Sequence, residues 1–267
     1  MTTNNFIYRE TQIAYKIFGQ GEAVVLLHGF GEDSSIWDNQ IDFLEPLCKL
    51  IIPDLPGTGY SRLLKQQNVG LEDYADCIKA LLDELEIESC ILLGHSMGGY
   101  ITLAFAEKYR DYIEAFGLVH STAYADTEEK IATRKKGIKF IEEHGPHAFL
   151  KYSTPNLFSE EFKKQHEDVI RTLIDKGKNF SVEALIQYYK AMIERPDRTE
   201  VLKESEVPVL FIIGTEDVAA PMKDLMNQVH LPKQSHIHVI ENVGHISTLE
   251  KPEELNEHLV AFIKNVF

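Results

Sequence analysis

The chain has only three cysteines among 267 residues, Cys48, Cys77 and Cys90, and their spacing matches no metal-binding motif. So few cysteines, in an odd number, exclude a scaffold held together by disulfides. Each lies in an apolar or helix-forming stretch, which predicts buried free thiols. Reduced thiols make the cytoplasm the expected compartment.

Basic side chains are scarce beside acidic ones, with 27 Lys and Arg against 42 Asp and Glu, and the formal net charge is −15 at pH 7. This charge repels phosphate backbones and anionic lipids, so we expect neither nucleic acid nor a membrane surface as a partner. Long apolar runs are also missing, since none approaches the roughly 20 residues that span a bilayer. The first residues lack a basic start followed by an apolar run, so we expect no signal peptide.

The remaining composition is that of an ordinary globular protein, with 44% hydrophobic and 26% charged residues. It excludes disordered, collagen-like and repeat architectures. The length permits one large α/β domain that carries an insertion.

Short apolar runs alternate with longer amphipathic stretches, which is typical of a mainly parallel sheet with crossover helices. The run at residues 23–27 is apolar on both faces, as a central parallel strand must be. Helices are expected at residues 71–85 and 97–109 and from Pro252 onward. We therefore predict an α/β fold with a mostly parallel eight-stranded sheet flanked by helices. The expected strands are residues 7–9, 12–18, 23–27, 49–53, 90–93, 115–119, 209–213 and 237–240.

The alternation breaks once, between residues 122 and 205, where the sequence is charged, aromatic and helical without a strand-like run. Residues 128–144 and 182–195 are expected to be helices there. A helical stretch of this length between two buried strands predicts an inserted cap above the sheet. The predicted domains are a core of residues 1–121 and 206–267 and a cap of residues 122–205.

The segment Gly94–His95–Ser96–Met97–Gly98–Gly99 carries the strongest chemical signal. A glycine two residues either side of a serine is weak evidence alone, but here a buried strand precedes the serine and an amphipathic helix follows it. A strand, a sharp turn with serine at its apex and a helix form the nucleophile elbow of serine hydrolases. The turn leaves no room for side chains beside the serine, whose strained backbone projects the hydroxyl above the sheet.

A serine hydroxyl needs a base and an acid partner, and in elbow enzymes these follow the serine in the order acid, histidine. Asp217 follows the strand at 209–213, and His245 follows the strand at 237–240. Because parallel strands end at one edge of the sheet, both can meet Ser96 there. Glu216 and Asp126 remain open as rival acids. His236 and His238 alternate on a strand without a third ligand nearby, so we expect no metal site.

Acyl transfer also needs donors for the oxyanion of its tetrahedral intermediate. One is the backbone N–H of the residue after the nucleophile, here Met97. The other comes from a loop after an early strand, here His28–Gly29–Phe30–Gly31, in which Phe30 is the expected donor. The Phe30 side chain is then free to line the acyl pocket.

These segments resemble the α/β-hydrolase fold superfamily over essentially the whole length of the chain. The resemblance implies a hydrolase with a Ser96–Asp217–His245 triad, Phe30 and Met97 as oxyanion donors, a helical cap and no cofactor. It rests on HGFGEDSSIW from His28, DLPGTGYS from Asp54, GHSMGGYITLAFA from Gly94, GTED–P from Gly214 and GHISTLEKP from Gly244.

Aromatic and apolar side chains of the predicted cap, of the early loops and of the position after His245 are candidates for the pocket. Their composition favours a small or medium carboxylic ester as the substrate. The candidates are Phe30, Trp37, Tyr124, Phe149, Tyr152, Tyr188, Met192 and Ile246, with Phe158 and Tyr189 as further cap aromatics.

Three function classes are weighed. The favoured one is an esterase that forms an acyl-enzyme on Ser96. Epoxide hydrolases and haloalkane dehalogenases look similar but need an aspartate at that position. Carbon–carbon bond hydrolases often carry an aromatic residue after the histidine, where this chain has Ile246, so that class or a lyase-type enzyme is the second. The third is a small-molecule receptor or regulatory protein with slow hydrolysis, because the HGFGEDSSIW segment is similar to one in such a branch.

Overall fold

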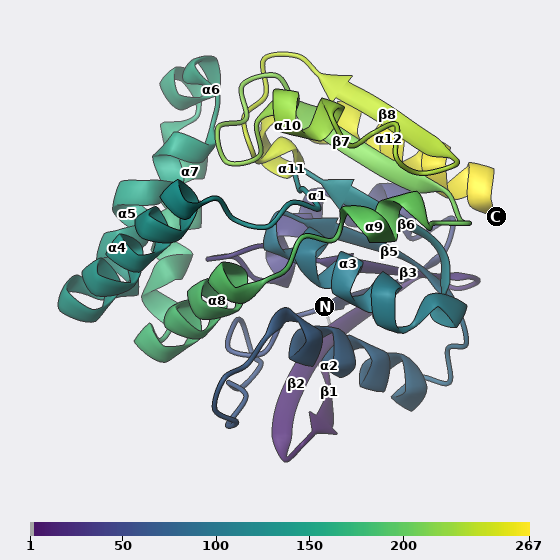
Figure 1. Cartoon of the computed structure of the whole chain (residues 1–267), viewed down its shortest axis with the longest axis horizontal. Coiled ribbons are helices and arrows are strands. Elements are labelled where there is room, and N and C mark those ends of the chain that lie inside the picture. The colour runs from purple at the N-terminus through teal and green to yellow at the C-terminus, as the bar shows by residue number, and fades with distance from the viewer. Residues whose placement is uncertain (1–2) are drawn as a thin grey trace.

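In the computed structural model, which describes residues 3–267, a single eight-stranded sheet runs through the molecule (Figure 1). The strand order is β1-β2-β4-β3-β5-β6-β7-β8. β2 pairs antiparallel with β1 and β4, and every other pair is parallel. This confirms the predicted α/β class. The strands are β1 Thr3–Tyr8, β2 Thr11–Phe18, β3 Ala23–Leu27, β4 Lys49–Pro53, β5 Cys90–His95, β6 Ile113–Val119, β7 Val209–Gly214 and β8 Ser235–Ile240.

Strand β3 explains why the central strands are apolar throughout. Successive side chains of a strand point to opposite faces, and Val24 and Leu26 enter one hydrophobic core while Val25 and Leu27 enter the other. All four are fully buried. β8 lies at the edge of the sheet, and its Ile237 is 42% exposed, which accounts for its weaker apolar pattern.

Each face of the sheet is covered by amphipathic helices. Buried residues of α2 (Leu71–Glu84) and α3 (Met97–Lys108) pack on one face, and those of α1 (Asp38–Leu44) and α12 (Pro252–Val266) pack on the other. In α2 the buried residues Leu71, Tyr74, Ile78, Leu81 and Leu82 form the expected stripe at steps of three and four.

Between β6 and β7, across residues 120–208, the chain contains helices and no strand. Helices α4 to α8 gather at one side of the molecule in Figure 1, whereas α9 returns toward α3. The exact division of the chain at residues 122 and 205 stays a prediction. The helices here are α4 Glu128–His144, α5 Pro146–Ser153, α6 Glu160–Gln165, α7 Glu167–Lys176, α8 Val182–Glu194 and α9 Thr199–Lys203, with the 3₁₀ turns η3 Thr154–Leu157 and η4 Gly177–Asn179.

Short elements complete the connections that follow the strands. They are the helices α10 Met222–Met226 and α11 Ser247–Glu250 and the 3₁₀ turns η1 Ser34–Trp37 and η2 Arg110–Tyr112. No helix within residues 3–267 combines the length and the apolar character that crossing a membrane requires. All three cysteines are buried and free, and burial raises the pKa of the Cys48 thiol to about 11.

Candidate active site

Ser96 lies on a sharp turn between β5 and α3, with a backbone φ of 51° and ψ of −117°. A non-glycine residue in this region is strained by about 1–3 kcal/mol, so the surrounding structure must hold it. A side chain at Gly94 would place its Cβ 2.2 Å from the Gly98 carbonyl carbon, and one at Gly98 would place it 2.6 Å from the Leu27 oxygen. The glycines around the serine are therefore required by backbone contact.

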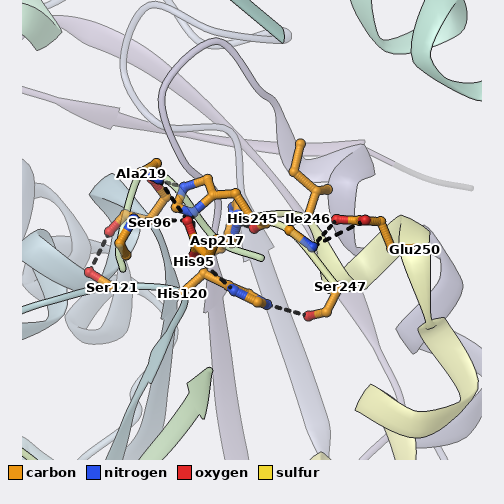
Figure 2. Close-up of polar contacts among 12 residues, drawn as sticks. His95, Ser96, His120, Ser121, Asp217, Ala219, His245, Ile246, Ser247 and Glu250 are labelled. Atoms are coloured by element: carbon orange, nitrogen blue, oxygen red, sulfur yellow. Dashed lines mark hydrogen bonds and ion pairs between the residues drawn. The ribbon is translucent and has the colours of Figure 1, made fainter. Parts of the chain in front are cut away.

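Ser96, His245 and Asp217 form one chain of hydrogen bonds (Figure 2). Ser96 Oγ lies 2.8 Å from His245 Nε2, and His245 Nδ1 lies 2.8 Å from Asp217 Oδ2. The three residues follow β5, β8 and β7 respectively, so the carboxyl ends of three parallel strands bring them together. This geometry lets the imidazole accept the serine proton while its other nitrogen donates to the carboxylate.

The Asp217 carboxylate receives four N–H groups. Oδ1 accepts from the backbone of Ala219 and Ala220, both at 2.8 Å, and Oδ2 accepts from His245 and from His120 at 3.2 Å. Burial alone would raise the pKa of Asp217. The hydrogen bonds and charge interactions with His245 and His120 outweigh burial and hold the pKa well below its ordinary value. The carboxylate is therefore ionised at neutral pH.

The two rival acids lie elsewhere. Glu216 adjoins Asp217, but its carboxylate accepts the backbone N–H of Glu160. Asp126 forms ion pairs with Arg134 and Arg195. Of the three acidic candidates, Asp217 is the one that contacts His245.

His120 is an additional buried partner of Asp217 that the sequence analysis did not single out. Its Nδ1 donates to Asp217 and its Nε2 accepts from Ser247 Oγ at 2.8 Å (Figure 2). Burial lowers the pKa of His120 to about 4, so the ring is neutral and carries its proton toward the carboxylate. It directly follows β6, and the strand-end rule that selected His245 could have found it.

Beneath the elbow, Glu32 and His95 form a second buried pair. His95 Nδ1 lies 2.9 Å from Glu32 Oε2, and the same oxygen accepts the Gly29 backbone N–H at 2.7 Å. His95 Nε2 donates to the His245 carbonyl at 2.8 Å. Burial opposes both charges, but mutual attraction and these bonds prevail: the pKa of His95 is raised and that of Glu32 is lowered. The pair links the His28–Gly31 loop to the loop of His245.

Glu250, on α11, fixes the loop that carries His245. Its carboxylate accepts the backbone N–H of Ile246, which follows the histidine (Figure 2). It also accepts the N–H groups of Gly244, which precedes the histidine, and of Ser159. The His245 N–H donates to the Leu157 carbonyl at 2.6 Å. Glu250 of α11 and the segment of Leu157 and Ser159, between β6 and β7, thus fix the backbone that carries the imidazole.

The backbone amides of Phe30 and Met97 are the expected oxyanion donors. Among residues 3–267, neither N–H has a hydrogen-bond acceptor. Met97 is the first residue of α3, where the N–H groups lack partners within the helix. The Phe30 ring stacks on Tyr189 with 4.2 Å between centroids.

A cavity of about 290 Å³ opens above Ser96 and His245. Of the residues predicted for the pocket, Phe30, Met192 and Ile246 line it, and so does Tyr189. The remaining wall comes from the loop after β3, from α3, from the helices and 3₁₀ turns between β6 and β7, and from the loop after β7. Those residues are Gly31, Glu32, Tyr100, Thr133, Arg134, Leu150, Ser153, Thr154, Leu157, Leu173 and Ala219.

Five predicted pocket residues do not line this cavity. Trp37 is fully buried and meets His95 edge to face. Tyr188 is fully buried and donates to the Pro56 carbonyl. Tyr152 is 74% exposed. Phe149 lies behind the wall, edge-on to Phe30 and Tyr189, and Tyr124 precedes α4 outside the lining.

Phe149 and Tyr152 contact another aromatic side chain of the segment between β6 and β7, Phe140. Phe158, the remaining candidate, is buried and stacks on Phe162. Composition reports how apolar this segment is, whereas the direction of each side chain depends on how its helices pack.

Among residues 3–267, His120, Asp217 and His245 have the only ligand atoms grouped closely enough for a metal, within 4.8 Å of one another. These atoms already form hydrogen bonds together, and both imidazoles turn an N–H toward the carboxylate. A metal would need these nitrogens without their protons. His238 stacks on His258 with 4.1 Å between centroids.

Comparison with known proteins identifies the fold and a range of relatives. A family model described as "Alpha/beta hydrolase family" matches residues 24–258. A malate-bound thermophilic esterase from Thermogutta terrifontis has a TM-score of 0.93 and 27% identity, with 100% of this chain and 99% of that chain covered.

Two curated relatives are hydrolases with other named substrates. A 2-hydroxy-6-oxononadienedioate/2-hydroxy-6-oxononatrienedioate hydrolase from Paraburkholderia phymatum is 27% identical over 264 residues, which cover 95% of this chain and 91% of the relative. An (E)-2-((N-methylformamido)methylene)succinate hydrolase from Acinetobacter baylyi is 25% identical over 253 residues, or 92% of each chain.

Proposed function

The chain belongs to the alpha/beta hydrolase family, and from this premise we propose that it is a serine hydrolase that cleaves small to medium carboxylic esters. The observation that carries the proposal is the hydrogen-bonded chain Ser96–His245–Asp217 at the floor of a cavity. Ser96 is the nucleophile, His245 the general base and acid, and Asp217 the group that orients the imidazole.

In the first step, Ser96 Oγ attacks the ester carbonyl while its proton moves to His245 Nε2. The resulting imidazolium is stabilised by the ionised Asp217, which the Ala219 and Ala220 amides hold in position. The oxyanion of the tetrahedral intermediate is accommodated by the Phe30 and Met97 amides. Removing one such donor typically costs about 3 kcal/mol of transition-state stabilisation.

In the second step, His245 returns its proton to the leaving alcohol, and the acyl group stays on Ser96. Water then enters, gives a proton to His245 and attacks the acyl carbonyl. Collapse of this intermediate restores Ser96 and releases the acid. Water supplies all the atoms that hydrolysis adds. His245 accepts and returns the proton in both steps.

The proposed substrate size follows from the cavity. Ligand pockets span roughly 300–1,000 Å³, and about 290 Å³ lies at the small end. Leu150, Leu157, Leu173 and Ile246 make much of the wall apolar, which suits an alkyl or acyl chain. The similarity to a chain titled as an esterase supports ester cleavage.

Carbon–carbon bond hydrolysis on the same triad is the second candidate, because a relative is named for a 6-oxo dienedioate. Such a substrate offers a ketone in place of an ester, so its hydrolysis breaks a carbon–carbon bond. Assays of a 6-oxo dienoate beside simple esters separate the two candidates by their kcat/KM values.

The test is a series of 4-nitrophenyl esters from acetate to octanoate with the wild type, Ser96→Ala and Ser153→Ala. Ser153 also lines the cavity, but its hydroxyl donates to the Phe149 carbonyl, so it is the matched control. We expect the highest kcat/KM at short to medium chains and a loss of about 1,000-fold or more in Ser96→Ala alone. Comparable activity in Ser96→Ala would overturn the proposal, and very slow turnover by the wild type would favour a regulatory protein.

A further inference from the structure

An aspartate flanked by two arginines lies beside the cavity. Arg134 Nε is 2.6 Å from Asp126 Oδ2, and Arg195 Nη1 is 2.9 Å from Asp126 Oδ1. The Asp126 side chain is fully buried, and those of Arg134 and Arg195 are 19% and 3% exposed. Two guanidinium groups thus share one carboxylate, and the cluster keeps one uncompensated positive charge.

Of the three residues, Arg134 is the one that reaches the cavity wall shared with Ser96 and His245. Its Nε and Nη2 donate to Asp126, and within residues 3–267 its Nη1 group has no assigned acceptor. The guanidinium also lies over the Tyr189 ring, 5.5 Å from the centroid. It is therefore held in one orientation with N–H groups left to bind a ligand.

Arg195 is engaged elsewhere and so does not compete for this role. Its Nε and Nη1 donate to the carbonyls of Tyr124 and Met192, and its guanidinium stacks 3.9 Å from the centre of the Tyr100 ring. It contributes positive charge behind the wall. Tyr100, four residues after Ser96 on α3, lines the same cavity as Arg134.

Glu32, the acidic residue among those that line the cavity, does not neutralise the charge of Arg134. Glu32 is bound to His95 and to the Gly29 amide. Much of the remaining wall is aliphatic, as with Leu150 and Leu173. A cation in such a wall is poorly solvated, and a planar guanidinium matches a carboxylate group in both charge and shape.

We infer that Arg134 forms a carboxylate-binding subsite beside the reacting serine, and that the substrates are esters that carry a second, free carboxylate. This inference rests on the proposed ester hydrolysis and names its substrate class. The ester carbonyl lies over Ser96 while the free carboxylate accepts hydrogen bonds from the Arg134 guanidinium.

The test uses two matched substrate pairs. Each pair contains an acid and its neutral amide of nearly the same shape: the mono-4-nitrophenyl ester of adipic acid with its adipamic analogue, and 4-acetoxybenzoate with 4-acetoxybenzamide. The first pair places the charge on the acyl side and the second on the leaving group. After subtraction of the rate without enzyme, we expect the acid to exceed the amide in kcat/KM by about tenfold or more in at least one pair.

The variants are Arg134→Met, Arg134→Lys and Lys135→Met. Lys135 is the next residue on α4 and is exposed, so its variant removes the same charge without touching the cavity. The ratio of acid to amide should fall to about one in Arg134→Met, stay intermediate in Arg134→Lys and keep its wild-type value in Lys135→Met. A wild-type ratio of one in both pairs, or a ratio that survives Arg134→Met, would overturn the subsite.

A binding measurement separates this inference from the proposed function and does not depend on Arg134→Met folding. Monomethyl adipate and methyl adipamate are titrated into Ser96→Ala by calorimetry. Tighter binding of the acid supports the subsite even if the wild type cleaves no ester, in which case the proposed function alone fails. Equal binding, together with normal cleavage of neutral esters, leaves the proposed function standing and rejects the subsite.

Discussion

Replacing Glu32 with glutamine should destabilise the protein, because a single oxygen of this buried carboxylate accepts two hydrogen bonds. Oε2 receives the Gly29 N–H and the His95 Nδ1–H. If glutamine places its oxygen there, His95 must remain charged beside a neutral group. If it places its amino group there, the Gly29 N–H loses its acceptor. One interaction is lost in either orientation.

A hydrogen bond that involves a charged group contributes about 1.5–3 kcal/mol, so we expect Glu32→Gln to lower the free energy of unfolding by about 2 kcal/mol. For a chain of this size, each kcal/mol shifts Tm by about 2–4 °C. The expected fall in Tm is therefore about 4–8 °C.

The effect should depend on pH in a defined direction. The folded pKa of Glu32 is lowered from 4.5, so its contribution is present above pH 4.5 and is lost as pH falls through the folded pKa. The folded pKa of His95 is raised from 6.5, so its contribution is present below pH 6.5 and is lost as pH rises through the folded pKa. The difference between wild type and variant should be largest between pH 4.5 and 6.5 and shrink above that range.

Urea unfolding followed by circular dichroism at several pH values measures this difference. Glu22→Gln is the matched control, because Glu22 is exposed and its variant should change the free energy of unfolding by less than about 0.5 kcal/mol. If Glu32→Gln were as stable as Glu22→Gln across the whole pH range, the reasoning about the Glu32–His95 pair would be wrong.

Three further predictions concern separate parts of the molecule. Asp217→Asn should lower kcat/KM by about 1,000-fold to 10,000-fold, since a neutral amide cannot stabilise the His245 imidazolium; ester kinetics check this, and near-normal turnover would refute the role of Asp217. Tyr188→Phe should cost about 1–3 kcal/mol in urea unfolding, because the buried Pro56 carbonyl loses its 2.8 Å donor; an unchanged midpoint would contradict this. Gly94→Ala should give little folded protein on size-exclusion chromatography, since its Cβ would lie 2.2 Å from the Gly98 carbonyl carbon; a stable monodisperse variant would contradict the close packing.

The sequence was informative about the fold because buried parallel strands have a simple pattern. Both faces of β3 enter hydrophobic cores, so alternation disappears and a continuous apolar run remains. The same rule led to the site: chemistry-bearing residues directly after such runs, as Ser96 and His245 do, lie at one edge of the sheet. Where one run is followed by two acids, as with Glu216 and Asp217, only the structure distinguishes the residue that turns inward.

The pocket was less predictable because its residues have no such positional rule. Tyr188 and Tyr189 are adjacent and chemically identical, yet Tyr188 is buried against Pro56 while Tyr189 lines the cavity. Rotation of α8 about its own axis decides which of the two tyrosines faces the cavity. That rotation depends on packing between helices. The sequence analysis did not single out Arg134 or Glu32, because a charged residue on a helix or in a loop is usually solvated.

The most direct test of the central claim is covalent labelling with a fluorophosphonate, followed by peptide mapping by mass spectrometry. The account predicts one adduct, on the peptide that contains Ser96, absent from Ser96→Ala and formed much more slowly in His245→Gln. An adduct on another residue, or equal labelling of Ser96→Ala, would contradict it.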